Sequence, residues 1–130
     1  MSLTQFLILQ RVFAIVSLMI ERLNHLIRGD ISSIDIYEVV NQKRFKLEIS
    51  LVDGWSILIS ELYQIEDYTL TIEYCYLLRN PSGDIVYGYD NAPHHLYIQT
   101  FPHHKHRYPK NQFRPTEFSG QFVNFLEDVI

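Results

Sequence analysis

The residues in this chain that are best suited to chemistry are histidines, and five of its six histidines lie in one short segment. Histidine is the side chain whose unperturbed pKa, ~6.5, lies closest to neutral pH. Clustered imidazoles can exchange protons with a substrate, and each positioned proton transfer typically contributes a factor of ~10²–10⁴ to a rate. The clustered histidines are His94, His95, His103, His104 and His106.

Cations and aromatic rings accompany these histidines. Residues 92–115 contain no Asp or Glu, although the formal net charge of the chain is −4. Lys105 and Arg107 are expected to bind phosphate and to stabilise charge on a phosphorane. Tyr87 and Tyr89 are expected to stack a base or bind phosphate. A local basic patch on an acidic chain predicts one site for an anionic ligand rather than a coat along a duplex.

Three interpretations of the histidine segment stay open from its residues alone. The first is acid–base catalysis on an anion, with Asp90 and Asn91 orienting an imidazole. The second is metal binding, because imidazole suits Zn, Ni, Cu and Fe, but no short metal-ligand spacing such as HExxH is present. The third is a set of semi-buried histidines that only hydrogen-bond. We expect the first, with no metal and no cofactor.

Other candidates are weaker. Carboxylates of the predicted strands, such as Glu61 and Glu73, are expected on the solvated face. Cys75 lies inside a predicted strand with no activating signature, so it is expected to pack as a small hydrophobe. As the single cysteine, it allows no internal disulfide. His25 is expected to be structural.

Length and composition predict one folded domain spanning residues 1–130. The chain is 47% hydrophobic and 20% charged, which is typical of a globular protein rather than a disordered one. The fold class expected is α+β: a helix over 1–29, an antiparallel sheet over 32–90, a histidine-rich loop over 91–116 and a short C-terminal helix over 117–130.

The N-terminal helix is expected to run from Leu3 to about Arg28 and to stop at Gly29. Its expected buried stripe follows three- and four-residue steps. Further apolar residues off the stripe leave room for a homodimer or partner contact. The run from Val12 to Ile20 is too short to span a bilayer, which needs about 20 residues. We expect no signal peptide, no membrane contact and a cytoplasmic protein. The stripe comprises Phe6, Leu9, Val12 or Phe13, Val16, Met19 or Ile20, Leu23 and Ile27.

About five strands are expected after this helix. Ile34 and Ile36 alternate with polar residues, and the run from Arg44 to Leu51 alternates cleanly, as a half-buried strand does. Asp53-Gly54 is typical of a type I′ hairpin, in which both central residues have positive φ. Tight turns join most strands, so the expected sheet is a meander with the long helix packed on one face.

Two histidine blocks carry a resemblance to a known family. The run from Tyr89 to His95 (YDNAPHH) and the run from Thr100 to His106 (TFPHHKH) resemble the signature of the TumE-type toxins of prokaryotic toxin–antitoxin modules. Tyr74 and Tyr76 match a Tyr-x-Tyr strand that precedes it. The resemblance covers roughly residues 34–107, and relatives often carry a polar residue where this chain has Leu77.

The resemblance implies a cytoplasmic toxin with a cognate antitoxin that is itself a DNA-binding repressor. Our first hypothesis is a metal-independent endoribonuclease in which the five clustered histidines act as acids and bases on RNA. The alternative is a non-catalytic binding module whose histidine-rich loop docks a partner or a structural metal. If the residue replaced by Leu77 is catalytic in relatives, this copy is impaired.

Overall fold

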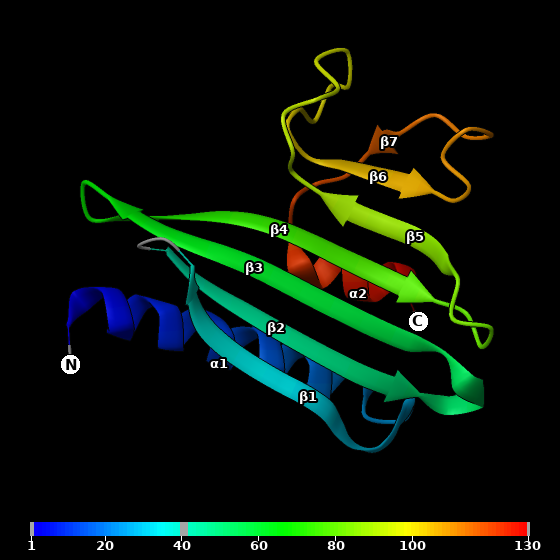
Figure 1. Cartoon of the computed structure of the whole chain (residues 1–130), viewed down its shortest axis with the longest axis horizontal. Helices are drawn as coiled ribbons and strands as arrows, with labels where there is room; N and C mark the ends of the chain where they lie inside the picture. The colour runs from blue at the N-terminus through cyan, green and yellow to red at the C-terminus, as the bar shows by residue number, and fades with distance from the viewer. Residues whose placement is uncertain (1, 40–41, 130) are drawn as a thin grey trace.

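The computed structural model describes residues 2–39 and 42–129, without the side chains of residues 29–42. Within these described residues, seven antiparallel strands form one sheet. The strands follow one another in chain order across the sheet, and both helices lie on the same face (Figure 1). The elements are α1 (Leu3–Leu23), β1 (Ile27–Val39), β2 (Gln42–Leu51), the 3₁₀ turn η1 (Val52–Gly54), β3 (Ser56–Glu66), β4 (Thr69–Arg79), β5 (Ile85–Asp90), β6 (His104–Arg107), β7 (Thr116–Glu117) and α2 (Phe122–Val129).

The α+β meander is therefore confirmed, but the expected number of strands was wrong. The two additional strands are β6 and β7, which lie in the segment expected to be an irregular loop and a helix start. β6 reads His-Lys-His-Arg, so it lacks the apolar alternation by which a strand is recognised in sequence. Because β7 takes Thr116 and Glu117, α2 begins only at Phe122.

The α1 helix starts where its sequence indicates and ends earlier than expected. Ser2 and Gln5 form a capping box, with each side chain hydrogen-bonded to the other residue's backbone N–H. The helix ends at Leu23, and Gly29 lies inside β1 rather than at a helix stop. The backbone N–H of Val52 donates to the carbonyl of Leu26, which fixes the turn between α1 and β1 against the end of β2.

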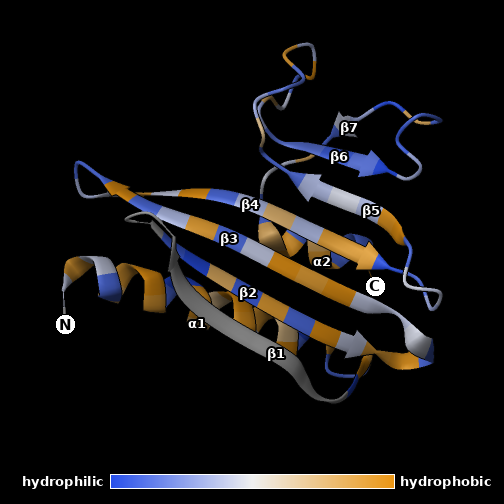
Figure 2. Cartoon of the chain, viewed as in Figure 1, coloured by the Kyte–Doolittle hydropathy of each residue, from blue (hydrophilic) through white to orange (hydrophobic). Residues whose placement is uncertain are grey.

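The buried face of α1 differs from the expected stripe. Met19 and Leu23 are buried as expected, but Phe6 and Leu9 are exposed. At the two positions where the stripe left a choice, Val12 and Met19 pack inward, and Phe13 and Ile20 are exposed. Because α1 is apolar over most of its surface, periodicity alone cannot choose its buried side (Figure 2). The whole of α1, 21 residues, is long and apolar enough to cross a membrane, whereas the run from Val12 to Ile20 alone is too short. Core helices of soluble proteins and N-terminal signal sequences meet the same criteria of length and composition. The buried residues are Ile8, Ile15, Met19 and Leu23; the exposed ones are Phe6, Leu9, Phe13 and Ile20.

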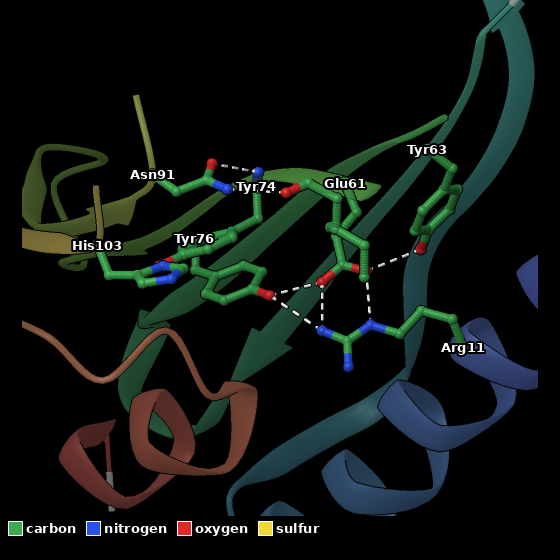
Figure 3. Close-up of polar contacts among 8 residues, drawn as sticks. Arg11, Glu61, Tyr63, Tyr74, Tyr76, Asn91 and His103 are labelled. Atoms are coloured by element: carbon green, nitrogen blue, oxygen red, sulfur yellow. Dashed lines mark hydrogen bonds and ion pairs between the residues drawn. The ribbon is translucent and has the colours of Figure 1, made fainter. Parts of the chain in front are cut away.

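A buried carboxylate decides which side of α1 faces the sheet. Glu61 is 0% exposed, which corrects the expectation of a solvated face. Arg11 of α1 donates to both of its oxygens, at 3.0 and 2.9 Å, and the hydroxyls of Tyr63 and Tyr76 donate as well (Figure 3). The alternation of β3 already placed this carboxylate inward, two residues after Ile59.

Alternating apolar residues of β2 and β3 and aromatic rings of β4, β5 and α2 fill the core between sheet and helices. Tyr76 and Tyr89 both pack against Phe125, with ring centroids 5.1 and 4.9 Å apart. Asp53 and Gly54 have φ of 60° and 83°, both positive as expected, but the turn is not the expected two-residue type I′ hairpin: Ser50 pairs with Ser56, and the three residues of η1 form the turn. The predicted alternation of Ile34 and Ile36 concerns side chains outside the described ones.

Candidate active site

The pairing of β5 with β6 sorts the predicted site residues onto two faces of the sheet. Asp90 is opposite His104 and Tyr89 is opposite Lys105. Because side chains alternate along a strand, His104 and His106 project from the face opposite the helices, and Lys105 projects toward the helices. The side chains of His104 and Lys105, although adjacent in the sequence, thus lie on opposite faces of the sheet.

Three imidazoles meet on the face away from the helices. His95, from the segment that follows β5, packs edge-on against His104 and His106, with ring centroids 4.8 and 5.4 Å apart. His104 and His106 are 4.8 Å apart and are only 1% and 6% exposed. We call His95, His104 and His106 the histidine cluster. Their ligand atoms lie within 4.8 Å of one another, a spacing that suits a metal ion as well as proton transfer.

Asp90 lies beside this cluster. Its Oδ1 is 2.9 Å from His104 Nε2, and its Oδ2 is 3.9 Å from His106 Nε2. The first contact is short but lacks the direction of a hydrogen bond, so His104 Nε2 has no hydrogen-bond partner among the described residues. Asp90 also accepts from the backbone N–H of Ala92 at 3.0 Å, which holds the carboxylate in place.

The two other clustered histidines lie apart from this group. His94 is exposed, and its ring is 6.3 Å from that of His95. His103 lies on the helix side of the sheet, where its Nδ1 and the hydroxyl of Tyr74 form a 2.8 Å hydrogen bond (Figure 3). The five predicted histidines therefore form no single group.

The predicted phosphate-binding and stacking residues also lie on the helix side or at its edge. Lys105 Nζ is 3.2 Å from the carboxylate of Asp128 and sits 4.5 Å from the ring of Tyr87. Tyr89 is 1% exposed and donates to the same carboxylate at 3.0 Å. The guanidinium of Arg107, an exposed residue, stacks on Phe113 at 4.3 Å.

Asn91 holds the backbone rather than an imidazole. Its Oδ1 accepts from the N–H of Tyr74 at 2.9 Å, and its Nδ2 donates to the carbonyl of Ile72 at 2.8 Å. The side chain thereby takes the place of a strand partner along β4, just where β5 ends. It fixes the start of the segment that carries His94 and His95.

A pocket of about 670 Å³ opens beside the histidine cluster. Its polar wall combines imidazoles, the two carboxylates of Glu73 and Asp90, and a cation, a set of groups that can transfer protons beside a positive charge. Lys110 supplies the cation, which no motif marked, although it falls within the acid-free window of residues 92–115. The polar wall includes Asp90, His94, His95, His106 and Lys110, and Phe113 adds an apolar surface.

Burial favours the neutral form of two rings of the cluster, His95 and His106. Desolvation, the charge of Lys110 and the proximity of His104 lower the pKa of His106 to about 4. Desolvation together with the neighbouring imidazoles of His104 and His94 also lowers the pKa of His95. Neutral imidazoles at pH 7 accept protons or bind metals. The thiol of Cys75, in contrast, has a pKa raised by burial and by Asp90, so it stays protonated and unreactive.

Leu77 lies on the same face as the pocket. It is opposite Gly88, which is opposite His106 on the next strand. A side chain at Gly88 would meet Leu77 and Tyr108 at 3.2 Å, so the three residues pack closely over the sheet. Leu77 thus belongs to the row of side chains that contains His106.

Comparison with known proteins identifies a family. The model of a family described as "Toxin TumE" matches residues 20–130, which include the sheet, both histidine blocks and α2. No curated protein and no solved structure matches the chain.

Proposed function

Because the chain belongs to the TumE toxin family, we propose that it is the toxin of a type II toxin–antitoxin module and acts in the cytoplasm as a metal-independent endoribonuclease. A toxin implies an antitoxin partner, and in this proposal the antitoxin is a DNA-binding repressor. The pocket beside the histidine cluster is the RNA-cutting site. The observation that carries the proposal is the meeting of two accessible imidazoles and a lysine in that pocket.

In the proposed reaction His95 is the general base. Its lowered pKa keeps the ring neutral at pH 7, so it accepts the proton of the RNA 2′-hydroxyl. The 2′-oxygen attacks the adjacent phosphorus, and His94 gives a proton to the departing 5′-oxygen. The products are a 2′,3′-cyclic phosphate and a 5′-hydroxyl.

Lys110 and the buried residues complete this arrangement. Lys110 lines the same pocket and stabilises the charge that develops on the non-bridging phosphate oxygens. His104 is too deeply buried to contact RNA, and in this proposal it positions His95, against which it packs. Lys105 is paired with Asp128, so it is not assigned to the phosphate.

Cleavage of RNA in EDTA tests this mechanism. Purified protein should cut single-stranded RNA, leave 2′,3′-cyclic phosphate ends and spare the same sequence made with 2′-O-methyl sugars. His94→Ala and His95→Ala should each slow cleavage by ~10²-fold or more. His25→Ala, an exposed histidine near the end of α1, is the matched control and should cut at the native rate. A requirement for added metal, or native cleavage by His95→Ala, would contradict the mechanism.

Growth of expressing cells tests the toxin role. Native protein from a tight promoter should arrest growth, and the His94→Ala/His95→Ala variant should not. A His103→Ala/His104→Ala variant is less informative, because its two histidines lie on opposite faces and one is buried. Arrest by the pocket variant at equal protein level would place the toxicity elsewhere in the chain.

The exposed apolar side of α1 is the proposed homodimer contact. Phe13 is 74% exposed and lies in the part of α1 that precedes the family match, as does Phe6. Apolar side chains grouped on one helix side are typical of an interface. Light scattering should give the mass of a dimer for the native chain and of a monomer for Phe13→Glu; a native monomer would refute the contact.

A further inference from the structure

The ring nitrogen Nε2 of His104 is buried beside a carboxylate and has no hydrogen-bond partner among the described residues, an environment that favours a bound cation. Its Nδ1 donates to the carbonyl oxygen of Pro102 at 2.9 Å, and because a carbonyl can only accept, Nδ1 carries the hydrogen. In the neutral ring the lone pair therefore belongs to Nε2. That nitrogen is buried and has no hydrogen-bond partner among residues 2–39 and 42–129.

The carboxylate of Asp90 makes this requirement stronger. Asp90 Oδ1 lies 2.9 Å from Nε2, so two electron-rich atoms face each other without a well-directed hydrogen between them. Such a contact is unfavourable in a buried setting unless a positive charge lies close to both atoms. A bound cation that takes the lone pair of Nε2 and is attracted to the carboxylate would satisfy both groups.

Two further imidazoles converge on the same place. The ligand atoms of His95, His104 and His106 all lie within 4.8 Å of one another. Metal ligation requires neutral imidazole, and the burial of His104 and His106, which are 1% and 6% exposed, disfavours a charged ring at this place. The hydrogen bond from His104 to Pro102 is the outer contact that usually fixes the orientation of a metal-bound histidine.

We propose that the histidine cluster, His95, His104 and His106, is a binding site for a divalent transition metal ion of the Zn²⁺ class, with the carboxylate of Asp90 balancing its charge. Zn–N distances of ~2.0–2.1 Å place tetrahedral donors roughly 3.4 Å apart. The cluster reaches that geometry by side-chain shifts on the order of 1 Å from its present spacing. Hard cations such as Mg²⁺ prefer oxygen donors and are not expected to bind.

One consequence rests on the proposed function. The metal would occupy the lone pair of His95 that the proposed mechanism uses to accept the 2′-hydroxyl proton. Metal binding and RNA cleavage would then exclude each other, and the ion would inhibit the toxin. Metal binding itself does not depend on cleavage, so the two proposals fail separately.

The direct test is calorimetric titration of ZnCl₂ into protein that has been stripped with EDTA and dialysed. We expect one ion per chain, no heat with MgCl₂, and a thermal unfolding temperature that rises with Zn²⁺. His95→Ala and His106→Ala should weaken Zn²⁺ binding at least tenfold. The controls His25→Ala and His103→Gln, whose histidines lie outside the cluster, should bind like the native chain.

Each outcome decides the inference. Absence of Zn²⁺ binding by the native chain overturns it, as does native affinity in both His95→Ala and His106→Ala. If His106→Ala does not fold, His95→Ala decides alone, because His95 lies in a connecting segment and is only half-buried. Zn²⁺ binding without any RNA cleavage in EDTA removes the proposed function and leaves the metal site; cleavage without Zn²⁺ binding does the reverse.

Discussion

The ion pair between Arg11 and Glu61 fastens α1 to the sheet, and Arg11→Met tests that role. Glu61 is fully buried and receives two hydrogen bonds from Arg11 and one each from Tyr63 and Tyr76. Methionine keeps much of the packing of the arginine stem but removes the guanidinium. The carboxylate is then buried with two phenol donors and no cation.

The structure bounds the size of the effect. Removing one partner of a buried ion pair destabilises a protein by ~3–5 kcal/mol, because the other charge remains buried. The side chain of Arg11 is 27% exposed, so water screens part of the interaction and we expect a loss of about 2–4 kcal/mol. For a chain of this size, 1 kcal/mol corresponds to roughly 3–5 °C, so thermal unfolding should occur roughly 6–20 °C lower.

A double-mutant cycle measured by urea unfolding gives the assay. Glu61→Gln keeps an acceptor for the phenols and should lose only ~1–2 kcal/mol. Once the charge is gone the guanidinium has little left to stabilise, so Arg11→Met/Glu61→Gln should be no less stable than Arg11→Met. Arg22→Met, an exposed arginine in the last turn of α1, is the matched control and should stay within ~0.5 kcal/mol of native. Additive losses within ~0.5 kcal/mol would refute the coupling.

Three further outcomes are expected. Urea unfolding in EDTA should show that the free energy of unfolding falls as the pH drops from 6.5 toward about 4. In that pH range His106 binds a proton in the unfolded chain but not in the folded chain, so acid favours unfolding. His106→Asn should remove this contribution to the pH dependence of the free energy of unfolding. Gly120→Ala should lower the melting temperature more than Gly83→Ala does. Both glycines have φ above +80°, so the backbone cost of alanine is similar. A Cβ at Gly120, however, would lie 2.5 Å from His103 Nδ1, whereas a Cβ at Gly83 would have no atom within 4 Å. Asn91→Ala should reduce the free energy of unfolding by ~1–3 kcal/mol and speed amide exchange in β4, since its side chain makes two backbone hydrogen bonds there.

The sequence predicted those parts of the fold whose signal is local. β2 alternates apolar and polar residues from Arg44 to Leu51, and Asp53-Gly54 favours a turn, so a hairpin follows from the residues themselves. The family match also agrees with the resemblance carried by the two histidine blocks. The buried face of α1 was not predictable in the same way, because the choice depends on Arg11 meeting a carboxylate 50 residues away.

The sequence indicated which residues lie close together in the chain but not how they are arranged in space. The five clustered imidazoles are divided between the two faces of the sheet, although Asp90 does lie against His104, as an orienting carboxylate was expected to do. Lys105 was assigned to phosphate although it pairs with Asp128, a residue of α2 whose proximity no local pattern reveals. The positive charge that lines the pocket comes from Lys110, which follows β6.

The register of β6 is what turns a basic, histidine-rich run into a defined site. A slip by one residue against β5 would send Lys105 to the pocket face and His104 to the helices, since the side-chain period of a strand is two. Neither the histidine cluster nor its contact with Asp90 would survive. Thr100 opposes such a slip: its hydroxyl donates to the carbonyl of His103 and accepts from the N–H of Phe118, so it ties the residue before β6 to the residue after β7. The chemistry of this chain therefore depends on a four-residue strand whose position is set by its neighbours rather than by its own sequence.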